Sequence, residues 1–302
     1  MKAFSPILLA MMATVIHAQS PSLLPATIGP EADFVSSVWP GGAPEWTVPD
    51  GEEHDSSKPD SRKQGSRSVV RLTNVRDVEL HCFVPSSPKS DSVVVIAPGG
   101  GFSILAWDLE GTEIAQWFKD LGIRAAVLKY RVPTRSEEEK WLAPVQDIQR
   151  AISMIHKGEV DGMKSDSVGV LGFSAGGHAA FRAAVAPKAF YETAPDTMHR
   201  RPEFCVLVYP AWLNQEGTTD LLDEIPVADE LPSLFVAHAT DDRVSCQSGI
   251  AAFETVRKSG SHAEMHLFAS GGHGFGGRLS GIGSDSWRSL AEKWMELEGI
   301  LD

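Results

Sequence analysis

From residue 68 onward, short runs of apolar, mostly β-branched residues alternate with segments whose apolar positions recur every three or four residues. This alternation predicts a mostly parallel central sheet with helices on both faces. The run SVVVIA at 92–97 is almost entirely apolar, as expected for a strand buried on both faces. The predicted strands are 69–73, 78–84, 92–97, 125–128, 167–171, 205–209, 234–237 and 265–268. The clearest helical patterns lie at 114–121, 144–155 and 285–297.

The beginning of the chain has a different pattern. Met1 and Lys2 precede an apolar run at 3–16 that is too short to span a bilayer comfortably, and the sequence HAQS follows as a cleavage site. We therefore expect 1–18 to be a signal peptide, and the mature protein to be secreted or periplasmic, with no membrane association.

Residues 19–66 are expected to form an arm and a linker ahead of a catalytic domain at 67–302. The arm contains Trp39 and Trp46, which we expect to dock as apolar anchors. The segment from Asp50 to Arg67 lacks large apolar side chains, which predicts a solvated linker.

Charge and cysteine content exclude several classes of protein. The chain has 27 Lys and Arg against 40 Asp and Glu, a net charge of −13, so it should repel nucleic acids and anionic bilayers. Three cysteines without CxxC spacing cannot form a disulfide framework. We expect no metal and no cofactor.

The sequence GFSAG lies between a predicted strand and a predicted helix. A G-x-S-x-G at such a turn is typical of a nucleophile elbow, in which the serine hydroxyl projects above the sheet. This pattern makes Ser174 the candidate nucleophile. Three glycines follow the strand at 92–97, and their amides are free of side-chain obstruction, which makes Gly100 and Gly101 candidate oxyanion-hole donors. Ala175, which follows Ser174 at the start of the predicted helix, is the third candidate donor.

A carboxylate and a histidine follow later strands in the order that this chemistry requires. Asp241 and Asp242 both follow the strand at 234–237, and Asp242 is preferred because its spacing before Val244 fits an H-x-x-x-D-x-V arrangement. Asp220 is a more distant alternative. His273 lies in a glycine-rich loop after the last strand and is the candidate base.

Other signals favour structural roles. The GHGFGG sequence matches GxGxxG, but too few residues follow it for a dinucleotide-binding unit. His262 and His266 lie too far apart along a strand to share a metal. We expect His178 to be a packing residue, and Asp108 and Glu110 to cap a helix.

Seven segments together resemble the α/β-hydrolase superfamily. They are APGGGF, EGTEIAQWF, LKYRVP, GFSAGGHAA, LVYPAW, HATDDRV and GGHGFG. Within the superfamily they are most similar to exported esterases related to acetyl xylan esterases and feruloyl-esterase-like (BD-FAE-like) proteins, from about residue 38 to the C-terminus. The resemblance implies an α/β-hydrolase fold with a Ser174, Asp242 and His273 triad and an oxyanion hole near Gly100, Gly101 and Ala175.

One departure from the family pattern concerns the glycine run. Many relatives have a histidine before it, where this chain has Ala97 and Pro98. We therefore expect the loop to be anchored differently, without loss of catalysis.

These observations predict a secreted serine hydrolase that removes short acyl groups of the acetyl type from carbohydrate. About 24 residues, at 210–233, separate two strands where many lipases carry a large cap domain, and this acidic segment is too short for one. Two alternatives remain open: a peptidase of the prolyl-oligopeptidase type, and a non-catalytic scaffold that binds glycan or protein. The 66 residues before the domain are too few for the β-propeller that such peptidases usually carry.

The expected export can be tested directly. When the protein is expressed with its own N-terminus in a secreting bacterial host, the mature chain should begin at or near Gln19, because the apolar segment is removed at the HAQS sequence. Intact-mass spectrometry of the exported protein measures this. An uncleaved chain held in the membrane fraction would contradict the prediction.

Overall fold

The computed structural model describes residues 29–58, 61, 63–64, 67–192 and 200–301. The predicted signal peptide and its cleavage site lie outside the described residues.

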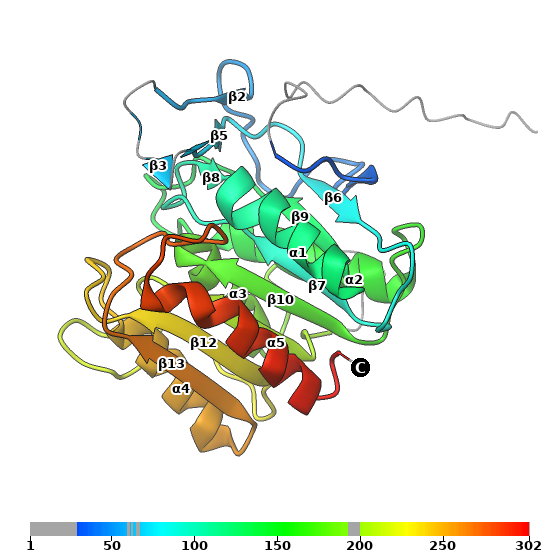
Figure 1. The fold of residues 1–302 in the computed structure, drawn as a ribbon. Coiled ribbons are helices and arrows are strands. Elements are labelled where there is room, and N and C mark those ends of the chain that lie inside the picture. Colours follow the sequence, from blue (N-terminus) through cyan, green and yellow to red (C-terminus); the bar gives the residue numbers. More distant parts are fainter. Residues whose placement is uncertain (1–28, 59–60, 62, 65–66, 193–199, 302) are drawn as a thin grey trace, which may run out of the picture.

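The core of the molecule is an eight-stranded sheet with the order β1-β6-β9-β7-β10-β11-β12-β13 (Figure 1). β6 is antiparallel to both of its neighbours, and the other pairings are parallel. The strands are β1 (Phe34–Ser37), β6 (Glu79–Phe83), β7 (Val93–Ala97), β9 (Arg124–Lys129), β10 (Val168–Phe173), β11 (Phe204–Val208), β12 (Ser233–Ala239) and β13 (Ala263–Phe268). The predicted mostly parallel sheet is confirmed.

Helices cover both faces of the sheet. α1 (Glu113–Leu121) and α5 (Trp287–Leu297) lie on the face toward the viewer in Figure 1. The opposite face carries α2 (Leu142–Lys157), α3 (Ser174–Val185) and α4 (Gln247–Ser259). α4 is absent from the elements predicted from sequence, whereas the other four agree with the predicted helical segments.

The strand order reverses at the centre of the sheet. After β7 the chain crosses to β9 on one side, and later returns to β10 on the other side of β7. In open α/β sheets such a switch point opens a crevice at the carboxyl ends of the strands. The glycine run follows β7 and Ser174 follows β10, so both flank this crevice.

The arm contributes to the sheet. β1 pairs with β6, from Phe34 opposite Cys82 to Ser37 opposite Glu79, and forms the sheet edge. This strand was not expected from sequence. Its side chains alternate between half-buried and exposed, as expected for a β-strand with one face covered by the protein.

The described part of 50–67 is mostly exposed or half-buried, as expected, but it forms strand pairs and is not an unpaired linker. β2 (His54–Asp55) pairs with β5 (Arg71–Thr73), which also pairs with β8 (Leu105–Ala106). β3 (Lys63–Gln64) pairs with β4 (Arg67–Ser68). Backbone pairing therefore supplies the order that apolar side chains do not. The first two strands predicted from sequence, at 69–73 and 78–84, correspond to β5 and β6. They lie in different sheets, β5 in the three-stranded sheet and β6 in the eight-stranded one.

The arm tryptophans dock on a buried ion pair, as expected of anchors. Arg131 and Asp147 are almost inaccessible and lie 2.8 Å apart. Trp39 donates a hydrogen bond to Asp147 at 2.7 Å, and the Arg131 guanidinium lies 5.8 Å from the centre of the Trp46 ring. The anchoring therefore combines apolar packing with neutralisation of a buried charge.

The segment between β11 and β12 contains no helix at 209–232, all of which is described, so no cap domain is inserted there. No helix among the described residues is long and apolar enough to cross a membrane. All three cysteines are free thiols; Cys82 and Cys205 are buried, whereas Cys246 is partly exposed.

A charged cluster fixes β6, β9 and the segment before β2. The Lys129 ammonium lies 2.9 Å from Glu53 and 2.7 Å from Glu79, and His81 lies 3.1 Å from Glu79. Burial opposes ionisation of Glu79, but the hydrogen bonds from His81 and Lys129 and the Lys129 charge lower its pKa to about 2.

This cluster predicts an acid-sensitive contribution to stability. Because an unfolded glutamate has a pKa of about 4.3, ionised Glu79 stabilises the folded state above that pH, and the contribution is lost as the pH falls toward 2. Glu79→Gln should therefore show a smaller fall in the free energy of unfolding between about pH 5 and pH 3 than the unmodified protein. Urea titrations measure this, with Glu296→Gln on the exposed side of α5 as the control. Parallel pH profiles for Glu79→Gln and the unmodified protein would contradict the account.

Candidate active site

Ser174 lies at a sharp turn between β10 and α3. Its φ of +50° is in the left-handed region, which a non-glycine residue rarely adopts without a local reason. Both flanking glycines are sterically required. A Cβ at Gly172 would approach the Gly176 carbonyl to 2.5 Å, and a Cβ at Gly176 would collide with the carbonyls of Ala97 and Pro98. The pattern G-x-S-x-G is therefore a packing requirement at this turn.

The structure brings the three predicted side chains together. Ser174 Oγ lies 2.9 Å from His273 Nε2, and His273 Nδ1 lies 2.8 Å from Asp242 Oδ2. Ser174 is 7% exposed, and the Asp242 side chain is fully buried. The arrangement has the geometry of a nucleophile, a base and an orienting acid.

Asp242 is held as a carboxylate. Burial would raise its pKa, but hydrogen bonds from His238, His273 and the Val244 amide hold the pKa well below the usual range of an aspartate. The Val244 amide donates to Oδ1 at 2.7 Å, and His238 Nε2 lies 3.3 Å from Oδ2. An acid fixed in this way can stabilise a positive charge on the His273 ring.

The competing acids have other surroundings. Asp241 is exposed and accepts a hydrogen bond from the Gly272 amide at 2.8 Å, so it fixes the loop that carries His273. Asp220 is exposed in the segment between β11 and β12. The sequence-based preference for Asp242 therefore agrees with the geometry.

The candidate oxyanion donors lie beside Ser174. Gly100 and Gly101, with φ values of +139° and +65°, line the same cavity as Ser174 and His273. Among the described residues, no acceptor is hydrogen-bonded to either amide. Ala175 is at the start of α3, where the first backbone amides of a helix have no intrahelical partner. These amides can converge on a developing negative charge.

Glu110 anchors the glycine loop. Its buried carboxylate accepts hydrogen bonds from the Gly99 amide at 2.8 Å and from the Tyr209 hydroxyl at 2.8 Å. The Tyr130 hydroxyl donates to the Pro98 carbonyl at 2.5 Å. These contacts anchor the loop that follows Ala97 and Pro98.

The expected capping role of Asp108 and Glu110 is wrong. The turn η1 (Asp108–Thr112) and α1 both lack a side-chain cap. Asp108 instead accepts from the Val70 amide and pairs with Arg278 at 2.5 Å, because both acids face inward rather than along the helix axis.

His178 is a packing residue, as expected. It is buried in α3, its Nδ1 lies 2.9 Å from the Ala211 carbonyl, and Arg182 donates to its Nε2 at 2.7 Å. Burial, together with the Arg182 charge, lowers its pKa to about 3, so it is neutral.

Several residues of the site were not predicted from sequence. Tyr209 follows β11, accepts from the Gly276 amide at 2.9 Å, and places its ring 5.1 Å from that of His273. Its position directly after a buried strand is a signal that could have identified it. The cavity above Ser174 has a volume of about 580 Å³, and its lining includes Trp212, Arg135 and Arg243. No group of three or more metal-ligating side chains gathers in the described ranges.

The order of the strands, the turn at Ser174 and the similarity to solved structures together define the class of protein. The chain has the fold of an α/β hydrolase. An acetyl ester-xyloside bifunctional hydrolase from Caldicellulosiruptor lactoaceticus superposes with a TM-score of 0.62 at 27% identity, covering 84% of this chain and 99% of that one. An α/β hydrolase from a Medee basin deep-sea metagenome library gives a TM-score of 0.59 at 26% identity, over 76% of this chain and 97% of that one.

Sequence comparisons make the placement narrower. The BD-FAE family model matches residues 80–224. An acetylxylan esterase of Xylanibacter ruminicola is 27% identical over 233 residues, which cover 69% of this chain and 46% of that protein. An endo-1,4-beta-xylanase B of Butyrivibrio fibrisolvens is 29% identical over 163 residues, covering 52% of this chain and 24% of that protein. The resemblance stated from sequence is confirmed, and the chain spans less than half the length of these two relatives.

The two adjacent acids provide a sharp test of the site. Asp242→Ala should lower kcat for an activated ester by about 10³-fold to 10⁴-fold, because His273 loses the carboxylate that orients it. Asp241→Ala should cost far less, because it removes only a contact to the Gly272 amide. Steady-state kinetics of the two variants, with circular dichroism to verify folding, make the comparison. Equal losses, or a larger loss for Asp241→Ala, would exclude Asp242 as the orienting acid.

Proposed function

We propose that this protein is a serine carboxylic-ester hydrolase that removes short acyl groups of the acetyl type, with a carbohydrate as the alcohol part of the ester. The observation that carries the proposal is the hydrogen-bonded series Ser174, His273 and Asp242, which opens into a cavity beside the glycine amides. The similarity of this chain to an acetylxylan esterase and to an acetyl ester-xyloside hydrolase supports the proposed substrate class.

The proposed reaction proceeds through an acyl-enzyme. His273 Nε2 takes the Ser174 proton as Oγ attacks the acyl carbon, and the amides of the oxyanion hole stabilise the resulting negative charge. His273 then protonates the departing sugar oxygen as the ester bond breaks, and this oxygen leaves as a free hydroxyl. Water, deprotonated by His273, attacks the acyl-enzyme and releases the carboxylic acid, and the proton returns to Ser174. Asp242 stabilises the positively charged imidazole of His273 during both acylation and deacylation.

The shape of the site favours a small acyl group. The apolar residues Val69, Ile104 and Leu109 line the cavity of about 580 Å³ together with polar and charged side chains, among them Gln64 and Arg135. A long acyl chain would have to lie against these polar groups, which costs free energy when they lose water. The segment at 209–232 adds no helical cap, so a bulky saccharide can approach.

Export remains part of the proposal. A secreted or periplasmic location follows from the apolar segment at 3–16 and would bring the enzyme to polymeric substrates outside the cell.

The chain-length preference is testable with p-nitrophenyl esters. kcat/KM should be higher for the acetyl ester than for the decanoyl ester, and acetylated xylan should release acetate. Ser174→Ala should lose about 10⁴-fold or more of kcat and all labelling by a fluorophosphonate, since the reactive hydroxyl is gone.

The outcomes discriminate between the candidate functions. A preference for the decanoyl ester would overturn the short-acyl assignment. Hydrolysis confined to peptide bonds would favour a peptidase. Absence of labelling in the unmodified, folded protein would favour a non-catalytic scaffold.

A further inference from the structure

The cavity above Ser174 has a charge opposite to that of the protein. Acidic residues outnumber basic ones by 40 to 27 in the chain, yet the cavity is lined by Arg71, Arg135 and Arg243 and by one carboxylate, Glu110. That carboxylate is buried and already accepts from Gly99 and Tyr209. We call Arg71, Arg135 and Arg243 the arginine rim.

The donors of the arginine rim are largely unused. Within the described part of the chain, none of the three guanidinium groups has a salt bridge. Arg71 donates one side-chain hydrogen bond to the Val69 carbonyl at 3.1 Å, and Arg135 donates one to the Gly101 carbonyl at 3.3 Å. A guanidinium carries five N–H donors, so most of them remain available for a ligand. Asp55 accepts a hydrogen bond from the backbone amide of Arg71, and the Arg71 charge contributes to lowering the pKa of Asp55 without a direct salt bridge.

Trp212 holds one of these cations in place. The Arg135 guanidinium lies 4.4 Å from the centre of the Trp212 ring, and the Lys140 ammonium lies 4.9 Å from it. Trp212 has a φ of +55°, a backbone conformation that is uncommon for a bulky residue and is enriched at functional sites. Burial, together with the Arg135 charge, lowers the pKa of Lys140, so the positive charges are close enough to repel one another.

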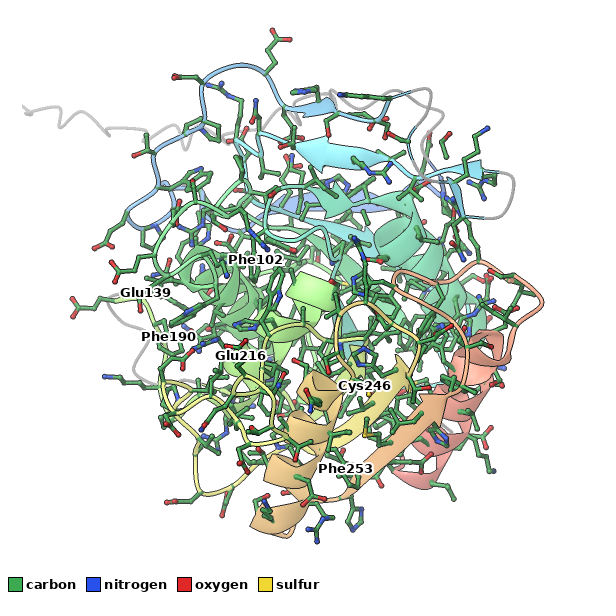
Figure 2. All side chains as sticks on the ribbon, turned by 90° about the vertical axis from the view of Figure 1, so that its left-hand side faces the viewer. Phe102, Glu139, Phe190, Glu216, Cys246 and Phe253 are labelled. Atoms are coloured by element: carbon green, nitrogen blue, oxygen red, sulfur yellow. The ribbon has the colours of Figure 1, made fainter. Side chains whose placement is uncertain are left out.

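A second cavity of about 520 Å³ continues from the first. The two share Trp212, Arg243 and Val244, and the second is also lined by Asn214 and Gln247, with Glu216 as its acidic residue. Figure 2 labels Glu216, which lines the second cavity, and Cys246, the residue before Gln247 of the same cavity. A saccharide longer than one ring can therefore extend from Ser174 across Arg243.

We propose that the arginine rim binds an anionic group, a carboxylate or a sulfate, on the saccharide that carries the ester, so that the preferred substrate is an acylated acidic saccharide. This inference rests on the proposed function. Guanidinium groups match the planar geometry of carboxylates and the oxygens of sulfate, and such charge-assisted hydrogen bonds are stronger than neutral ones. An anionic ligand near Arg135 also relieves its repulsion with Lys140.

Direct binding tests the inference without turnover. Ser174→Ala protein is titrated by calorimetry with three oligosaccharides of equal length: a neutral xylo-oligosaccharide, a uronic-acid oligosaccharide and a sulfated one. At least one acidic ligand should bind about 10-fold more tightly than the neutral one, and the difference should shrink at high salt. The stronger of the two acidic ligands identifies carboxylate or sulfate as the recognised group.

Charge-removing variants locate the binding site. Arg243→Gln and Arg135→Gln, each made in the Ser174→Ala protein, should remove most of the preference for the acidic ligand. Arg257→Gln is the matched control, because it removes the same charge at the exposed end of α4, where Arg257 pairs with Glu254 away from the cavity. Equal affinity for the neutral and acidic ligands, or an equal loss of preference in Arg257→Gln, would overturn the inference.

This failure differs from failure of the proposed function. If unmodified protein hydrolyses acetylated neutral xylan while the binding test shows no acidic preference, the esterase proposal stands and the arginine rim has no role in recognition. If no ester is hydrolysed while acidic saccharides still bind through Arg243, the proposed function fails and the binding site stands.

Discussion

The close approach of the start of α3 to the loop after β7 is the constraint on which the site depends. The backbone of Gly176 lies so near the carbonyls of Ala97 and Pro98 that no side chain fits there. Because β7 and β10 are adjacent parallel strands, this contact brings the glycine run and Ser174 to one crevice. The left-handed backbone at Ser174 is retained because the surrounding packing requires it.

The loop after β7 is also held by a buried carboxylate. Glu110 binds the Gly99 amide with one oxygen and the Tyr209 hydroxyl with the other. Tyr209 in turn accepts from the Gly276 amide, in the loop that carries His273. A single carboxylate therefore connects the loops after β7, β11 and β13, which come from distant parts of the chain. Burial and the Glu110 charge raise the pKa of Tyr209, so its hydroxyl stays protonated and can donate.

Sequence patterns predicted the features that depend on local spacing. The strand at 92–97 and the turn at Ser174 were accessible because apolar runs and flanking glycines act over a few residues. Strand β1 and the pairings of β2 were not, because backbone hydrogen bonds to distant segments order them without an apolar signature. The inward orientation of Glu110 was missed for a similar reason, since its partners follow β7 and β11, far away in sequence.

Charge is distributed differently at the site and over the rest of the protein. An excess of acidic residues keeps the surface negative, which weakens binding of polyanions at random positions. Arg71, Arg135 and Arg243 line the cavity beside Ser174, so the proposed anion site lies where the local charge opposes that of the chain. If the arginine rim binds the anionic group as proposed, long-range repulsion by the rest of the protein would suppress unproductive contacts, and short-range attraction by the rim would place the ester beside Ser174.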